Sequence, residues 1–580
     1  ASIFSKRCFT SLELYSFLEV FKSLADQYDQ VSYIKEDKIT RFLKIPYILG
    51  VSPVIFQMIS YLGAFPFCQD APTILGSNQM IMVIVIMTKR YQKVLRKDIH
   101  YYTKILFRSL AIYDRNDLPR KSNVPDNGDM KQGTNKSQLN LEARSEATAN
   151  DKGEEEDDDN LASAALDLIC STKSSKISEI PISQISIPSD NFRKLILLLL
   201  LMAPLSSHES LSVHYERLLE ERLGGLRRTA DSILAAFINV EKSPGVRFHE
   251  FNRVISTSLP FLFNGLGPLF ENFLLLDNIN VPKQTEIPTP EVKSSVLAYQ
   301  PQSALMGDIL DLNVLSQLSF FLSWSMLRRL RLLYSGGNDG FSMGSFETHV
   351  FNWRAPTILL VSGNRISEPP SNGQERAFSS ALPQKRFPNS SNSSRLVFGI
   401  YLSQYWRQSY KTCFGDSDTL IFELEPMHEV FHASSLNTNY ISYSKSTPNQ
   451  GISAGCPHPL PKPISDYSNH MNLGEVSLYL DSSFEFGVFT HHYTSRGGAF
   501  YPSETRKFDW QDRFEIESLE VWGCGGDNEA EQQKERWHWE EREAEARRRI
   551  NLGSGDIQTD RALLEMAGIL GANMSGGSIY

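Results

Sequence analysis

The sequence predicts an α+β protein: an antiparallel β-sandwich with short helices, preceded by an α-helical region and followed by a helical tail. Apolar residues recur at helical spacing before residue 282, and runs of β-branched and aromatic residues dominate after residue 298. A highly charged segment follows Gly526. No long helices alternate with the predicted strands, so a parallel βαβ sheet is disfavoured and an antiparallel sandwich is favoured.

At 580 residues the chain is too long for one compact core, because single domains usually hold ~100–200 residues. Composition divides it into an N-terminal helical region (1–115), an acidic linker (116–190), a second helical block (191–285), the sandwich domain (298–524) and a C-terminal helical extension (525–580). The linker includes the acidic run Glu154 to Asp159. It holds too little apolar surface to offset the entropy of ordering and is predicted to be disordered, and Ala162 to Ile169 is the stretch in it that suggests a short helix.

Leu12 to Leu43 has the pattern of a helix-loop-helix pair, which is also the outline of an EF-hand. If Ile34 is the eighth loop position, the first is Gln27, and neither regular oxygen ligands nor the central Gly follow. In the second block, taking Gly245 as the sixth position puts residues without a carboxylate at positions one, three, five and twelve: Val240, Lys242, Pro244 and Phe251. We therefore expect EF-hand-like but ion-free helix pairs.

Two apolar runs, Met80 to Met87 and Leu195 to Leu205, are about half the ~20 residues that a membrane-spanning helix needs. They are predicted to be buried helices or strands.

The net charge of −9 disfavours direct binding to nucleic acid. The six cysteines include no CxxC pair, so neither a disulfide framework nor a zinc ribbon is indicated, and the reducing cytosol or nucleus is favoured.

The strand signals are five apolar runs bounded by turn residues: Pro356 to Val361, Leu396 to Tyr401, Leu420 to Leu424, Val476 to Leu480 and Phe484 to Phe489. Two insertions rich in Ser, Pro and Asn, Glu368 to Ser394 and Lys445 to Met471, are predicted to be mobile surface loops.

His428-Glu429-Val430-Phe431-His432 matches HExxH, in which two His one helical turn apart bind zinc and the Glu activates water. Pro426 and Asn437 give no sign of a long helix through the motif. In an extended segment four residues span ~13 Å, too far for both imidazoles to reach one ion. Ser435 and Thr438 stand where a metzincin has Gly and His. Ordinary half-exposed histidines are the main interpretation, and a zinc-dependent hydrolase on His428, Glu429 and His432 is the alternative.

Gly340 to Gly344 spells GxSxG, but a turn precedes it, so Ser342 is predicted to be a helix N-cap rather than a nucleophile.

A redox role for Cys413, Cys456 or Cys524 is a weaker hypothesis, because no basic neighbour or resolving Cys is evident. No cofactor is expected, since phosphate-binding and dinucleotide-binding loops are missing.

Glu529 to Ile550 mixes acids and bases at helical spacing. A charged helix with few apolar positions either packs along the sandwich or binds a partner. Its candidate partner-binding residues are Trp537, Trp539, Arg547, Arg548 and Arg549.

Several stretches closely resemble a TLDc domain over about Ala298 to Cys524. They are Gly340-Phe341-Ser342, Ala355 to Val361, Phe398-Gly399-Ile400-Tyr401 with Trp406, Phe414-Gly415, Leu478-Tyr479-Leu480-Asp481, Gly487 and Leu519-Glu520-Val521-Trp522-Gly523. The resemblance implies a β-sandwich flanked by short helices with no established catalytic residues.

Further stretches are similar to the fungal restriction of telomere capping protein family over nearly the whole chain: Cys8 to Ser16, Tyr61 to Phe67, Phe341 to Trp353 and Gly487 to Trp522. That resemblance implies a cytoplasmic, non-enzymatic protein named from a genetic link to telomere capping. TLDc relatives are tied to oxidation resistance and bind the vacuolar proton-pumping ATPase, whose assembly they regulate. The expected partners are therefore subunits of that ATPase, with at most peripheral association at the vacuole membrane.

Overall fold

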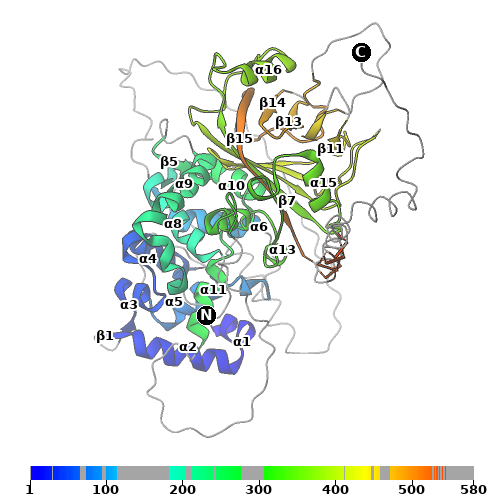
Figure 1. Ribbon diagram of the computed structural model, residues 1–580. Coiled ribbons are helices and arrows are strands. Elements are labelled where there is room, and N and C mark those ends of the chain that lie inside the picture. The colour runs from blue at the N-terminus through cyan, green and yellow to red at the C-terminus, as the bar shows by residue number, and fades with distance from the viewer. Residues whose placement is uncertain are drawn as a thin grey trace, which may run out of the picture.

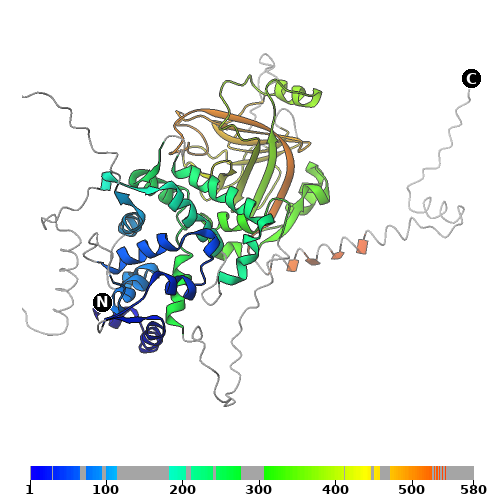
Figure 2. The ribbon, with the colours of Figure 1, turned by 90° about the vertical axis from the view of Figure 1, so that its left-hand side faces the viewer.

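A computed structural model of the protein shows a helical body on one side and a large β-sheet on the other (Figures 1 and 2). The described residues are 2–28, 31–65, 74–93, 99–113, 182–203, 211–238, 243–275, 306–410, 412–445, 450–457, 471–494 and 496–525, with 528, 531–532, 534–535, 538–539 and 542–543. Most of the predicted linker and tail lies outside these residues. Within the predicted linker, residues 182–190 form a 3-10 turn, a strand and the start of a helix.

The helical body is built from elements on both sides of the linker. Before it come α1 (Ser2–Cys8), α2 (Ser11–Leu24), α3 (Glu36–Phe42), η1 (Tyr47–Leu49), α4 (Ser52–Gly63), α5 (Ser77–Met87), η2 (Arg90–Lys93) and α6 (Ile99–Leu110). After it come η4 (Ile182–Gln184), α8 (Ser189–Met202), η5 (Leu211–Leu218), α9 (Glu220–Phe237), α10 (Phe248–Thr257), α11 (Leu266–Glu271) and η6 (Asn272–Leu274). Short strands join them: β1 (Asp26–Tyr28) with β2 (Val31–Tyr33), and β3 (Ile112–Tyr113) with β4 (Ile185–Pro188) and β5 (Gly245–Arg247).

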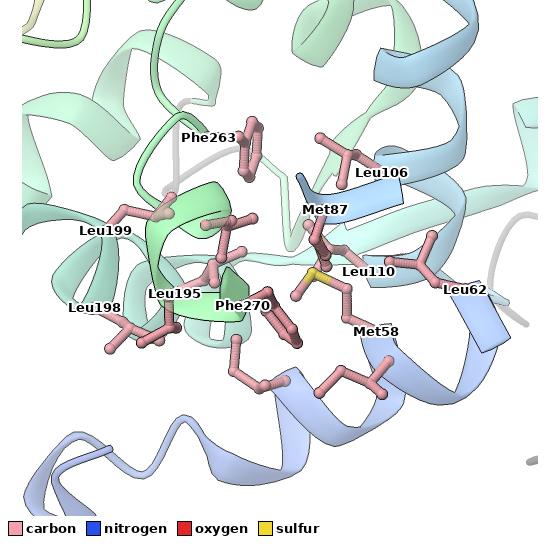
Figure 3. Packing of buried hydrophobic residues seen from close by; sticks show 14 of the residues in the cluster. Met58, Leu62, Met87, Leu106, Leu110, Leu195, Leu198, Leu199, Phe263 and Phe270 are labelled. Atoms are coloured by element: carbon pink, nitrogen blue, oxygen red, sulfur yellow. The ribbon is translucent and has the colours of Figure 1, made fainter. Parts of the chain in front are cut away.

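The two predicted helical blocks share one hydrophobic core. Figure 3 shows Met58 of α4 and Leu110 of α6 beside Leu195 of α8 and Phe270 of α11. The prediction of buried helices or strands is confirmed where the runs are described: both are helical, and every residue of Met80 to Met87 and of Leu195 to Met202 is buried. Residues 204–205 lie outside the described part of the chain. Among the described residues, none of the helices combines the length and apolarity needed to cross a membrane.

Helices flank both loops that were compared with EF-hands: α2 and α3 enclose the β1–β2 hairpin, and α9 and α10 enclose β5. In the second loop residues 239–242 lie outside the described part of the chain. Gly245 begins β5, whose pairing with β4 connects this loop to the strand that precedes α8. Since β4 also pairs with β3, which precedes the linker, this three-stranded sheet joins the two halves of the helical body.

The sheet domain begins with α12 (Leu312–Leu318) and α13 (Trp324–Leu327) and also contains α14 (Gly336–Asp339), α15 (Met343–Val350) and α16 (Gly373–Ala381). Its strands are β6 (Arg331–Ser335), β7 (Thr357–Arg365), β8 (Arg395–Leu402), β9 (Leu420–Glu425), β10 (Glu429–His432), β11 (Ile441–Ser444), β12 (Gly451–Ala454), β13 (Val476–Asp481), β14 (Phe486–His491) and β15 (Trp510–Gly523).

These ten strands form one antiparallel sheet in the order β10-β9-β8-β7-β15-β14-β13-β12-β11, with β6 paired to β15. The predicted antiparallel pairing is confirmed. The sheet folds over on itself, because the rings of Phe398 in β8 and Phe489 in β14 stack at 4.9 Å, and Phe431 in β10 also contacts Phe489 at 5.3 Å. The sandwich therefore consists of two halves of a single continuous sheet.

Strands β7 and β8 are buried on both faces over most of their length, which explains their nearly continuous apolar runs. Side chains such as Leu359, Phe398 and Phe431 point into the sandwich, whereas Leu360, Phe422 and Val430 pack against the helices that precede β6. The alternation of side chains along a strand assigns each residue to one face.

The structure differs from the prediction in the connections. Strands β6, β10, β11 and β12 are each four or five residues long and were not predicted. Both insertions predicted to be mobile loops contain regular structure, since α16 lies in the first and β12 in the second. Asn372 caps α16 by accepting a hydrogen bond from the backbone N–H of Glu375 at 2.7 Å, so a polar, turn-rich sequence still supports a helix.

Gly363 in β7 should not tolerate a side chain, because a Cβ there would lie 2.1 Å from the carbonyl oxygen of Glu515 in β15. We expect Gly363→Ala to lower the free energy of unfolding by about 1–3 kcal/mol, the usual cost of forcing extra atoms into a packed core. Gly344→Ala is the matched control, because its Cβ would meet nothing within 4 Å. Denaturant unfolding of both variants tests this, and equal stabilities would contradict the close approach of β7 and β15.

Candidate functional site

The HExxH residues lie on an edge strand rather than on a helix. His428 directly precedes β10, which pairs antiparallel with β9, and Glu429 to His432 form the strand itself. Successive side chains of a strand point to opposite faces. His428 and His432 therefore lie on one face and Glu429 on the other.

Both histidines contact the C-terminal end of α10. His428 donates from Nε2 to the carbonyl oxygen of Ser258 at 3.2 Å, and His432 donates from Nε2 to that of Thr257 at 2.8 Å. Nδ1 of His428 accepts a hydrogen bond from Nε2 of Gln317 at 3.2 Å. The expectation of two half-exposed histidines is wrong for His428, which is 1% exposed because the helical body covers it. Burial lowers the pKa of His428 to about 4, so the ring is neutral at pH 7.

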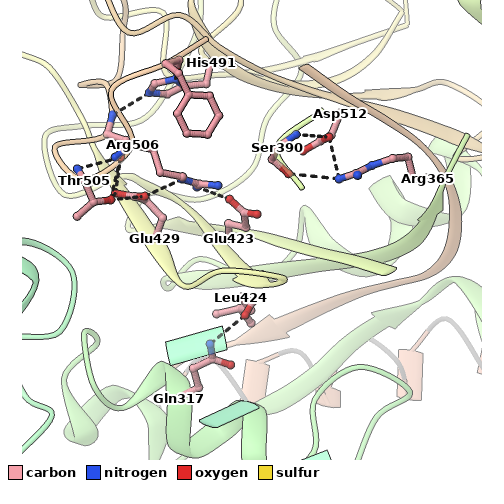
Figure 4. A network of polar contacts seen from close by, with 12 residues as sticks. Gln317, Arg365, Ser390, Glu423, Leu424, Glu429, His491, Thr505, Arg506 and Asp512 are labelled. Carbon is pink, nitrogen blue, oxygen red and sulfur yellow. Dashed lines mark hydrogen bonds and ion pairs between the residues drawn. The ribbon is translucent and has the colours of Figure 1, made fainter. Parts of the chain in front are cut away.

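Glu429 faces a buried polar network on the other side of β10 (Figure 4). Its carboxylate accepts hydrogen bonds from Ser503 Oγ at 2.8 Å and from Thr505 Oγ1 at 2.9 Å, and it pairs with Arg506 Nε at 3.0 Å. The same guanidinium contacts Glu423 of β9. Arg506 thus joins two neighbouring strands to the loop before β15.

Burial shifts the pKa values of the ionisable groups in this network, which holds neighbouring strands together. Burial raises the pKa of Glu423 to about 7, although Arg506 opposes the shift. The Arg506 guanidinium also lies 4.0 Å from the ring centroid of Trp510, and the ring of His491 stacks on Trp510 with the centroids 3.7 Å apart. Burial, with Arg506 nearby, lowers the pKa of His491 to about 3. A second pair, Arg365 to Asp512 at 2.9 Å, lies in the same layer.

The zinc-hydrolase alternative therefore has no assembled site. The two imidazoles are bonded to separate backbone carbonyls, and Glu429 points away from both of them. Nowhere in the described ranges do three His, Cys, Asp or Glu side chains gather so that they could hold a metal ion.

The other candidate residues are engaged locally. Ser342 caps α15, as predicted, by accepting a hydrogen bond from the backbone N–H of Ser345 at 3.1 Å. Burial raises the pKa of Cys413 to about 11 and that of Cys524 to about 12, and it raises the pKa of the buried Cys456 as well. Thiols with such pKa values carry little thiolate, which disfavours the redox hypothesis.

The predicted C-terminal helix is described only in part. Residues 528, 531–532, 534–535, 538–539 and 542–543 are helical. Trp539 is 58% exposed, a large value for this residue type. Trp537, Arg547, Arg548 and Arg549 lie outside the described residues.

Sequence reasoning missed Gln317, Glu423 and Arg506. The signal for Glu423 was available, because a carboxylate in the middle of Leu420-Ile421-Phe422-Glu423-Leu424 requires a partner if the strand is buried. No sequence pattern connects it to Arg506, which is 83 residues away.

Loss of the Arg506 guanidinium should be strongly destabilising, because it leaves two carboxylates buried without their cation. We expect Arg506→Met to lower the free energy of unfolding at pH 7 by about 3–5 kcal/mol. Lys507→Met is the control, because Lys507 is exposed, and surface substitutions usually change stability by less than about 0.5 kcal/mol. If denaturant unfolding showed a small and equal effect of both substitutions, the Arg506 network would not be a main contributor to stability.

His428 should make the protein less stable in acid. Its pKa is about 4 in the folded state and 6.5 ordinarily, so between these values the unfolded chain binds more protons and the free energy of unfolding falls as the pH falls. The contribution is about 3 kcal/mol over that window. His491, whose pKa is also lowered, changes the free energy of unfolding with pH in the same direction, and Glu423, whose pKa is raised, changes it in the opposite direction. Both residues are still present in a variant of His428, so they do not affect the comparison with the parent protein.

We therefore expect His428→Gln to show a shallower decline of stability from pH 6.5 to 4 than the parent protein. His249→Gln, at an exposed histidine with 63% side-chain exposure, serves as the control and should keep the parent slope. Unfolding measured at several pH values decides the matter, and parallel curves for all three proteins would contradict a buried neutral ring.

Comparison of the sequence with known proteins identifies the family. Residues 306–525 match the family model of the TLDc domain. The chain is 51% identical over 583 residues to "Restriction of telomere capping protein 5" of Colletotrichum graminicola. The alignment covers 100% of this chain and 96% of that protein. The proteins of the same name from Fusarium vanettenii and Neurospora crassa are 51% and 50% identical, with the same coverage. The chain belongs to the restriction of telomere capping protein 5 family and carries a TLDc domain.

Proposed function

We propose that this chain is a non-enzymatic binding protein that holds a subunit of the vacuolar proton-pumping ATPase and shifts the assembly equilibrium of that pump. The observation that carries the proposal is a contrast within the TLDc domain and its extension. The side chains that could do chemistry are bonded internally, whereas the helical residues beyond β15 present an exposed tryptophan.

Trp539 is suited to be an anchor for a partner. Tryptophan and arginine dominate the few residues that carry most of the energy in protein interfaces. The described helical residues on either side, at 531–532, 534–535 and 542, are exposed as well. In this proposal Trp537 and the cluster Arg547, Arg548 and Arg549 act with Trp539 on the same partner.

The family name adds a genetic context. The relatives are named for restriction of telomere capping, and we propose that this chain influences that process indirectly, since its net charge of −9 disfavours contact with nucleic acid. The proposed place of action is the cytoplasm, with peripheral association at the vacuole membrane through the ATPase. A role in oxidation resistance would follow from the same interaction.

Binding should depend on the C-terminal helix. We expect removal of the residues after Gly526 to abolish capture of the peripheral sector of the ATPase in a pull-down with the purified chain. Trp539→Ala should weaken the affinity by roughly thirtyfold, the effect of losing an interface anchor worth about 2 kcal/mol.

Leu436→Ala is the matched control, because Leu436 is 74% exposed on the sheet domain, and it should bind like the parent protein. Full binding by the truncated chain would remove the helix from the mechanism. Absence of binding by the full chain would refute the proposal.

A further inference from the structure

A pocket opens between α16 and the hairpin formed by β13 and β14, in the part of the sheet domain where β15 begins (Figure 1). Arg513 of β15 holds α16 in this place, because its guanidinium donates to the carbonyl oxygen of Pro383, directly after the helix, at 2.7 Å. The volume of the pocket is about 330 Å³. This volume is near the lower limit of ligand sites, so the pocket suits one or two side chains rather than a large cofactor.

The pocket exists because α16 carries small side chains where it faces the hairpin. Ala377 and Ala381 are one helical turn apart on the same face of the helix, and both line the pocket. Phe378, also in the lining, stacks on Phe486 of β14 with the ring centroids 5.1 Å apart. The buried Tyr479 of β13 lines the pocket as well. The walls are therefore apolar and aromatic, and contacts within the fold hold them in position.

The charge in the pocket is negative. Its lining includes the carboxylates of Asp481 and Glu485 but no Lys or Arg. In the part of the chain that the structure describes, neither carboxylate is ion-paired. Asp481 fixes the hairpin turn, because its Oδ1 accepts hydrogen bonds from the backbone N–H groups of Glu485 and Phe486, both at 2.9 Å. The backbone that carries Glu485 is thus held in place beside the pocket.

An arginine side chain has the chemistry that matches these walls. Its planar guanidinium stacks on aromatic faces while its N–H groups donate to a carboxylate, and it is more weakly hydrated than the ammonium of lysine. Its methylene stem can lie along apolar surface such as the two alanines of α16. Ala377 and Glu485 are both exposed at the mouth of the pocket. An arginine on the surface of another protein can therefore enter without any unfolding of this chain.

We propose that the pocket between α16 and the β13–β14 hairpin binds an arginine side chain of a partner protein, with the guanidinium against Phe378 and facing the carboxylates of Glu485 and Asp481. The inference goes beyond the proposed function, because the residues after Gly526 take no part in it. The pocket lies where β15 begins, whereas the C-terminal extension follows the end of that strand. Removal of the extension therefore leaves the pocket intact, and the two proposals can fail separately.

Met471 lines the pocket, so its methyl group, labelled with ¹³C in the full chain, reports binding by NMR. The probe is N-acetyl-L-arginine amide, and N-acetyl-L-citrulline amide is its neutral counterpart of nearly the same shape. We expect the arginine probe to shift the Met471 resonance saturably with a Kd of about 1 mM, which is typical of a ligand of this size. The citrulline probe should bind at least about tenfold more weakly, because it lacks the charge-assisted hydrogen bonds. The Met471→Leu variant assigns the resonance.

Free L-arginine distinguishes a protein side chain from a metabolite as the ligand. Its α-carboxylate would meet the carboxylates of Asp481 and Glu485, so it should bind more weakly than the blocked probe. Tighter binding of free arginine would overturn the assignment to a partner protein. Equal binding of the arginine and citrulline probes, or no saturable shift of the Met471 resonance, would overturn the proposal altogether.

Two substitutions test the pocket itself. Glu485→Gln should weaken binding of the arginine probe several-fold, because it removes one negative charge and keeps the shape of the side chain. Ala377→Leu should fill the hollow and abolish the shift. Ser380→Leu is the matched control, because Ser380 is exposed on the same helix but does not line the pocket, and it should bind like the parent protein. Unchanged binding by the Glu485 and Ala377 variants would contradict the proposed site.

Discussion

The extended conformation of β10 is the constraint on which the joint between the two halves of the molecule depends. Because side chains alternate along a strand, His428 and His432 face the helical body and Glu429 faces the interior of the sheet domain. One face of this segment thus contacts the C-terminal end of α10, and Glu429 on the other face binds Arg506. A helix through the same residues would place both histidines on one face, one turn apart.

The buried polar groups follow from that position. A strand enclosed on both sides cannot leave polar atoms in contact with water, so each needs a partner inside the protein. Gln317 meets this need between the layers, since its side-chain N–H groups reach both His428 and the carbonyl oxygen of Leu424, at 3.1 Å. Within the sheet domain, Arg506 is the partner of the buried carboxylates of Glu423 and Glu429. The residues that most resemble a catalytic motif are therefore occupied in holding the fold together.

In the function proposed above, binding takes place on the surface of the chain. The helical body and the TLDc domain are coupled through buried hydrogen bonds, including that of Arg217 to Asn313 at 2.9 Å and that of His428 to the carbonyl oxygen of Ser258 at 3.2 Å. Two features lie at this surface: the pocket between α16 and the β13–β14 hairpin, and the helical residues with Trp539. Both combine apolar side chains with charge, which is the composition of binding surfaces rather than of active sites.

The sequence by itself determined the class of fold and the family. Local patterns sufficed for the helix α8, for the strands β7 and β8 and for the Ser342 cap, since each depends on neighbouring residues. Only the tertiary structure decided that the strands form one folded sheet, that the helices on both sides of the linker share a core, and that His428 is buried. The same holds for the contact of Glu423 with Arg506. These features join residues far apart in the chain, such as Phe42 and Phe273 in the shared core. No local periodicity encodes which distant side chain will neutralise a buried charge.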